Sequence, residues 1–166
     1  MPGVSRYPEE TPLSDLEQRV AILEGIAIGG EWTAFTPVLT ASVTDPTLGT
    51  SSKQEGRFIR LRGGLVVYRF LVQFGTSGTN AGDGQYRISL PVPATSLAPS
   101  NVNTSMGQGV LFDWSIAGHK ELCTWQWGIS SYLIGVVDDA TISHNAPFNW
   151  TVDDRMSGTV TYQAIT

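Results

Sequence analysis

The chain has 166 residues and a net charge of −5, and 15% of its residues are charged. Eighteen glycines and nine prolines with so few charges are typical of a turn-rich, mainly β protein built from one domain. Residues 32–166 carry nine acidic and eight basic groups, which argues against electrostatic capture of nucleic acid. The single cysteine, Cys123, excludes a disulfide within one chain and a cysteine-based zinc site.

The beginning of the chain shows no apolar run resembling a signal peptide. No stretch approaches the roughly 18 apolar residues of a membrane span, so we expect no membrane insertion. Residues 1–12 contain Pro2, Pro8 and Pro12, and we interpret them as an extended N-terminal arm that docks on a partner.

Residues 13–30 follow a heptad pattern typical of a short coiled coil. Ser14 and Glu17 have the capping-box spacing that starts a helix, and Gly29 and Gly30 end it. The a and d positions form one apolar seam, made by Leu13, Leu16, Val20 and Leu23. A helix this short is marginal on its own, so a further surface is needed to hold the chains together.

Arg19 falls at a g position and Glu24 at the following e position, five residues later. This offset places an ion pair between chains in a parallel coiled coil, although an exposed pair contributes only about 0–1 kcal/mol. The alternative is an amphipathic helix packed on its own domain. The heptads alone do not distinguish two strands from three.

From residue 31 to residue 166 the apolar pattern changes to the alternation of β-strands. We expect an antiparallel β-sandwich, jelly-roll-like, with around eight strands. Loops are predicted at 76–84 and 94–105. The predicted strands cover residues 34–43, 57–61, 65–74, 85–90, 109–117, 121–128, 132–137 and 158–164.

The strand predicted over 65–74 is apolar on both faces. One face carries Val66, Tyr68, Phe70, Val72 and Phe74, which we assign to the core. The other face is too apolar for water alone, and we expect it to lie in the core or against a neighbouring subunit. Its apolar residues are Leu65, Val67 and Leu71.

Several short motifs occur in order along residues 32–166. They are WTAFTPVLTA (32–41), PTLG (46–49), GRF (56–58), GLVV (64–67), GQYRISLP (84–91), PFNW (147–150) and GTVTY (158–162). Together they resemble the small C-terminal β-domains of tail-fibre and minor structural proteins of tailed bacteriophages, particularly phages of actinobacteria. This resemblance implies a homotrimer on the virion surface, often behind a short coiled coil.

The resemblance therefore predicts a non-enzymatic, trimeric short fibre or spike that recognises the host surface. It would be made in the host cytoplasm, and its N-terminal arm would bind a phage capsid or tail protein. Only about two heptads separate arm and head, so a trimeric capsid decoration protein that stabilises the shell is the alternative. A polysaccharide-degrading spike is a more distant one.

Enzymatic chemistry has little support, because His119 and His144 are the only histidines and no nucleophile elbow or zinc-protease motif occurs. We expect no cofactor. Two acidic pairs could bind calcium or act as glycosidase carboxylates, but adjacent aspartates are more often turn residues. These pairs are Asp138 with Asp139, and Asp153 with Asp154.

Aromatic residues crowd the second half of the chain, and an exposed indole face can stack on a sugar. Trp125 and Trp127 are two apart on one predicted strand and therefore point the same way. The alternative is that such residues fill the core or a subunit interface. The candidates for glycan binding are Trp125, Trp127, Tyr132 and Trp150.

A local basic stretch could meet an acidic envelope polymer or capsid surface, or could be a solvated strand edge. It consists of Lys53, Arg57, Arg60, Arg62 and Arg69.

Overall fold

The computed structural model describes residues 31–95 and 104–165. It is mainly β, which confirms the predicted class, and no α-helix occurs among these residues. The predicted arm, the coiled coil with Leu13, Leu16, Arg19, Val20, Leu23 and Glu24, and most of the loop at 94–105 lie outside the described residues. The strands are β1 (Thr33–Phe35), β2 (Leu39–Ala41), β3 (Lys53–Arg60), β4 (Leu65–Gln73), β5 (Tyr86–Ser89), β6 (Ser105–Asp113), β7 (His119–Ile129), β8 (Tyr132–Val137), β9 (Ala140–Thr141) and β10 (Arg155–Gln163).

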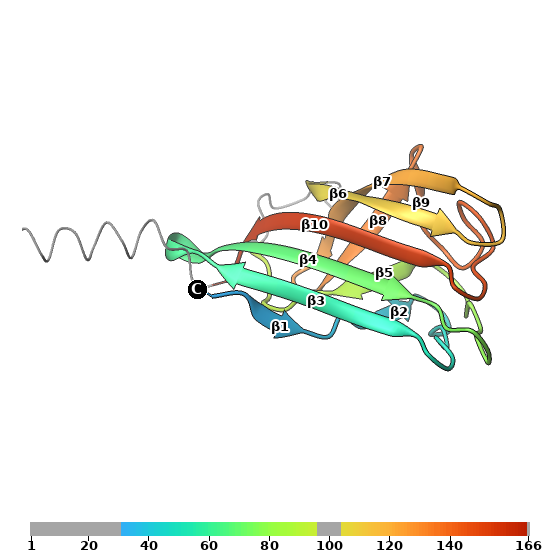
Figure 1. The fold of residues 1–166 in the computed structure, drawn as a ribbon. Coiled ribbons are helices and arrows are strands. Elements are labelled where there is room, and N and C mark those ends of the chain that lie inside the picture. The colour runs from blue at the N-terminus through green and yellow to red at the C-terminus, as the bar shows by residue number, and fades with distance from the viewer. Residues whose placement is uncertain (1–30, 96–103, 166) are drawn as a thin grey trace, which may run out of the picture.

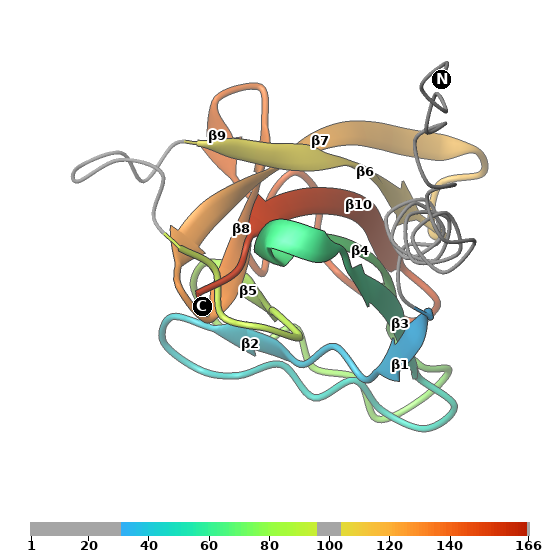
Figure 2. The same ribbon diagram turned by 90° about the vertical axis from the view of Figure 1, so that its left-hand side faces the viewer.

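The strands form one curled antiparallel sheet in the order β1-β3-β4-β10-β6-β7-β8-β5-β2, with β9 paired to β8 (Figure 1). β1 and β2 lie at opposite ends of this order, yet only residues 36–38 separate them in the chain. Three residues span at most about 11 Å. The sheet must therefore curl until its two edge strands come close together, as the view along the curl shows (Figure 2).

Pro37 divides what we had predicted as one strand over 34–43 into β1 and β2, so that prediction was wrong at this point. Proline has no N–H to donate to a strand ladder. The side-chain amide of Gln54 in β3 donates to the Pro37 carbonyl (2.9 Å), and the Ser89 N–H in β5 donates to the Val38 carbonyl (3.0 Å). The segment between β1 and β2 therefore bonds to β3 on one side and to β5 on the other, and so joins the two edges of the sheet.

The interior is filled by alternate residues of the strands. The predicted core face of β4 is confirmed, because Val66, Tyr68, Phe70 and Val72 are all buried, as is Phe74 directly after the strand. Edge-to-face contacts extend this core, for example between Phe70 and Trp125, whose ring centroids are 5.0 Å apart. Each fully buried large apolar side chain contributes roughly 1.5–3 kcal/mol to folding. The Cys123 thiol is also buried, and burial raises its pKa to about 12.

Two glycines make room for Trp125 at the centre of the sheet. A Cβ atom at Gly109 or Gly158 would overlap the Trp125 indole. The indole N–H donates to the Ser157 carbonyl at 3.2 Å, so the buried ring also satisfies its polar atom. Small residues on β6 and β10 therefore allow the sheet to pack closely around one large side chain.

The curled sheet has two ends. At the near end, Leu65 at the start of β4 pairs with Gln163 at the end of β10, and β1 begins there too. At the far end, Gln73 pairs with Arg155, and the β6–β7 loop follows Asp113. The short 3-10 turn η1 (Arg62–Gly64) joins β3 to β4 at the near end. Figure 1 shows the near end at the left and the far end at the right.

Strand positions otherwise agree with the predicted ones to within a few residues, and 132–137 was predicted with its observed bounds. The strand predicted over 109–117 instead ends at Asp113, because Trp114–Gly118 turns: the His119 N–H donates to the Ile116 carbonyl (3.0 Å). The short strand β9 was not predicted.

Candidate functional site

The outer face of β3, β4, β10 and β6 carries the main surface feature of the described residues. The strand register places outward side chains in rows that cross all four strands. One row is mostly polar and consists of Arg57, Arg69, Thr159 and Gln108. The next row towards the far end consists of Glu55, Leu71, Ser157 and Val110.

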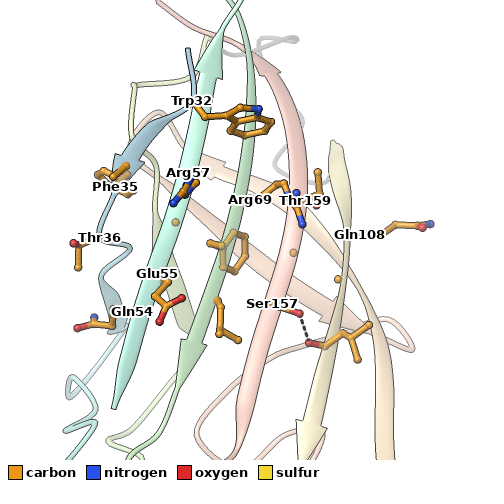
Figure 3. Close-up of a pocket in the computed structure, with 17 residues that line it drawn as sticks. Trp32, Phe35, Thr36, Gln54, Glu55, Arg57, Arg69, Gln108, Ser157 and Thr159 are labelled. Atoms are coloured by element: carbon orange, nitrogen blue, oxygen red, sulfur yellow. Dashed lines mark hydrogen bonds between the residues drawn. The ribbon is translucent and has the colours of Figure 1, made fainter. Parts of the chain in front are cut away.

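These two rows, with Trp32 and Ala34 beside them, line a shallow groove of ≈ 1180 Å³, which we call the outer groove (Figure 3). Trp32 lies at its near end and is 44% exposed. Arg57 projects from β3 and Arg69 from β4, where Arg69 lies beside Thr159 of β10. The groove therefore combines an exposed indole, two guanidinium groups and a strip of apolar surface.

The two arginines of the outer groove are direct register partners on neighbouring strands. Like charges placed opposite each other destabilise a sheet. Among the described residues, neither Arg57 nor Arg69 has an ion-pair partner, and both side chains are exposed. Their arrangement does not stabilise an isolated subunit, and both guanidinium groups are open to contact with a partner.

The side chains that line the outer groove are suited to binding. Glu55 is the single carboxylate among the described residues that line it, and none of them is a histidine or a cysteine. Glycoside hydrolysis ordinarily uses two carboxyl groups that flank the bond. Arg57, Arg69, Gln108 and Thr159 instead offer hydrogen-bond donors on an open surface.

The residues predicted for a subunit interface lie on this same outer face. Leu65 is exposed, and Val67 and Leu71 are half-buried. All three point away from the filled interior because they alternate with the core residues of β4. The outer face of β4 is therefore open to a partner in the isolated chain.

The aromatic residues predicted for glycan binding lie mostly inside. Trp125 and Trp150 are buried, so neither presents a ring to a ligand, and that part of the prediction is corrected. Trp127 is half-buried against the core on the same side of β7 as Trp125. Tyr132 is half-buried beneath the Arg87 guanidinium, 4.9 Å from its ring centroid. These positions agree with the alternative that aromatic residues fill the core.

The exposed tryptophans are Trp32 and Trp114, which we did not select from the sequence. The alternation of strand residues could have identified Trp114 as an outward residue. Leu111 and Asp113 point into the interior, so Phe112 and the next alternate residue, Trp114, belong to the outer side.

The two histidines each contact a carboxylate. His119 lies between Glu121, whose Oε1 is 2.9 Å from Nε2, and Asp113, whose Oδ2 is 3.5 Å from Nδ1. His144 Nδ1 accepts a hydrogen bond from the Gly84 N–H (3.1 Å) and lies 3.3 Å from Asp83. No nucleophile adjoins either ring among these contacts, so they organise loops.

The two buried aspartates of the far end differ in their electrostatics. Burial alone would raise the pKa of Asp113, but hydrogen bonds from Ser115 and the attraction of His119 outweigh it and lower that pKa. Burial raises the pKa of Asp154, and the nearby Asp113 adds to this effect, although N–H groups of Thr151 and Trp114 act against it.

The adjacent aspartate pairs behave as turn residues. Asp138 and Asp139 have φ angles of 46° and 66° in the tight turn between β8 and β9, a conformation typical of hairpin turns. Asp153 accepts a hydrogen bond from the Gln73 side chain (3.0 Å), and Asp154 bonds the backbone of its own loop. Across residues 31–95 and 104–165, no group of three or more metal-binding side chains comes together.

Comparison with protein families, with curated proteins and with solved structures finds no match to this chain. In the described part of the chain no helix has the length and apolar character needed to cross a membrane.

Proposed function

We propose that the chain is the subunit of a non-enzymatic, homotrimeric virion-surface protein, a short fibre or spike whose head is displayed for host-surface recognition. The observation that carries this proposal is the open outer face of β4, where Leu65, Val67 and Leu71 stay at the surface of a sheet whose interior is already filled. A second copy of the chain covers this face.

The position of Trp32 supports a second copy as the partner. The heptad segment ends at Gly30, two residues before Trp32, and Trp32 lines the outer groove. Helices of a parallel coil lie about 8–10 Å apart, so each head begins close to the common axis. The face nearest Trp32 is then turned towards that axis. Leu71, Val110 and Ala34 bury apolar surface there, and burying one leucine side chain contributes roughly 1.5–3 kcal/mol.

In this arrangement the near end points to the particle and the far end to the surroundings. The N-terminal arm attaches the trimer to a capsid or tail protein. Loops at 75–84 and 114–118 and the turn at Asp138 and Asp139 lie at the far end and are presented to the host. The jelly-roll-like sandwich remains part of the proposal for the head, and the bend at Pro37 supports it, because strands switch between packed sheets at such bends.

Labelling of the parent particle tests the proposal. Antibodies against the head, viewed on intact particles by electron microscopy, should bind at the virion surface, and purified trimer should adsorb to cells of the host or to their isolated wall polysaccharide. Particles that carry no label would contradict a virion location. A folded trimer that does not adsorb would contradict host recognition.

The copy number per particle distinguishes the second candidate, a capsid decoration protein. The shortness of the heptad segment favours it, because a long shaft is missing. Hundreds of copies spread over the shell would establish decoration, whereas a few to tens of copies at one vertex or on the tail would establish a fibre or spike.

A further inference from the structure

The β6–β7 loop at the far end holds two large apolar side chains out in solvent. Trp114 is 53% exposed and Ile116 is 57% exposed. The Trp114 ring contacts Phe112, with centroids 5.5 Å apart, but leaves about half of its surface in solvent. The loop lies at the end opposite Trp32. It follows Phe112, the next outward residue of β6 after Val110, so it adjoins the far end of the outer groove.

Two buried carboxylates fix this loop. The Trp114 N–H donates to Asp154 Oδ1 at 2.7 Å, and Asp154 is fully buried. The Ser115 N–H and hydroxyl donate to Asp113 Oδ1 at 2.9 Å and 2.6 Å. The backbone N–H groups of Trp114 and Ser115 are thus each held by a buried side chain, so the exposed residues sit on a preorganised backbone.

Two cations lie beside the aromatic pair Trp114 and Phe112. The Arg155 guanidinium lies 5.1 Å from the Trp114 ring centroid and 5.9 Å from that of Phe112. The Lys120 ammonium lies 5.8 Å from the Phe112 centroid. In the described chain neither cation has a carboxylate partner, because the nearby Asp113, Asp154 and Glu121 bond to the loop backbone or to His119.

We propose that Trp114, Phe112, Arg155 and Lys120 form a binding site for an acidic saccharide. The indole stacks on the apolar face of a sugar ring. The carboxylate group of the saccharide binds the two cations, Arg155 and Lys120, and so provides the negative partner that they lack in the described chain. The inference rests on the proposed host recognition, and it names both the ligand class and the end of the head that meets it.

Calorimetric titration of the full chain tests the site with defined probes. The acidic probes are tetragalacturonate and a hyaluronan hexasaccharide, and maltotetraose is the uncharged control. We expect an acidic probe to bind and the uncharged one to bind about tenfold more weakly. Trp114→Ala and Lys120→Gln should each weaken binding by about tenfold, since stacking and the charge contact each contribute on the order of 1–2 kcal/mol.

Ile129→Ala is the matched control, because it removes an exposed apolar side chain at the near end of β7, outside the outer groove, and should leave binding unchanged. Failure of both acidic probes to bind the parent, or unchanged binding by Trp114→Ala, would overturn the site. Masses measured on the same samples separate the two proposals: a monomer that binds would refute the trimer and keep the site, and a trimer that does not bind would refute the site alone.

Discussion

The backbone N–H of Trp114 and the Oδ1 atom of Asp154 are joined by a 2.7 Å hydrogen bond that links an exposed indole to a fully buried carboxylate. The other oxygen of Asp154 accepts from the Thr151 N–H at 2.6 Å, and its carbonyl accepts from the Phe74 N–H at 2.9 Å. One residue therefore ties together the ends of β4 and β6 and the start of β10. The conformation of the loops at the far end therefore depends on Asp154.

Asp154→Asn should destabilise the head by about 1–3 kcal/mol, because an amide offers one acceptor where two N–H groups need one each. The penalty should depend on pH. Burial raises the pKa of Asp154, so the folded parent holds a proton at pH values where the unfolded chain has released it. The parent therefore loses stability as the pH rises from about 4 through this pKa, and the variant does not.

Urea denaturation of both proteins between about pH 4 and pH 7 measures this difference. The gap in unfolding free energy should be largest at the acidic end. Asp113 has a lowered pKa and acts in the opposite direction, but the stability that it contributes is lost only below about pH 4, outside the range of the measurement. A gap that widens towards neutral pH would show that the ionised form of Asp154 is the stabilised one. Glu55→Gln, on the open outer face, should change little at any pH.

Gly158→Ala should cost about 1–3 kcal/mol or more, because the added methyl group would overlap the Trp125 indole. Thermal unfolding of the variant measures the loss. In a Trp125→Phe background the same substitution should cost less, since the smaller ring leaves room. Equal costs in the two backgrounds would mean that the glycine is needed for backbone reasons and not for the indole.

The sequence predicted the mainly β fold class and most of the strands. The reason is that apolar residues alternate along a strand according to which face is buried, as over 65–74 and 132–137. It did not predict the break at Pro37 as the closing corner of the sheet, since that depends on β3 and β5 meeting across it. By contrast, the apolar outer residues of β4 could be predicted, because the pattern of a single strand shows them: Leu65, Val67 and Leu71.

The outer groove could not be foreseen, because its rows combine four strands whose order is non-sequential. The same reason explains why the burial of the aromatic residues was not predicted. Trp125 looked like a surface candidate by composition, but the glycines that admit it, Gly109 and Gly158, come from other strands. Trp114 was placed inside a strand predicted to extend to residue 117, whereas β6 ends at Asp113 and the Trp114 N–H bonds to Asp154.

Leu71→Asp should weaken self-association, because it places a charge in the row between Glu55 and Ser157 of the face proposed to be covered. Sedimentation velocity should show dissociation towards a single chain, with the far-UV circular dichroism of the head unchanged. The matched control is Val43→Asp, at a 70% exposed position outside the outer groove, which should associate like the parent. Identical association of both variants would exclude this face as the interface.

The double substitution Leu16→Asp and Leu23→Asp removes both d positions of the heptad segment. It should weaken assembly or attachment to the particle while the β signal of the head in circular dichroism is retained. Normal assembly and attachment by this variant would show that the heptads do not organise the protein. A Glu24→Gln variant, which would lose only the ion pair predicted with Arg19, should differ from the parent by about 0–1 kcal/mol.

The central claim is a homotrimer held through the outer face of β4. The most direct test is the molar mass of the purified full chain in solution, by light scattering or sedimentation equilibrium. Three chains of 17.9 kDa predict about 54 kDa, stable on dilution. A stable species of 17.9 kDa would contradict the account.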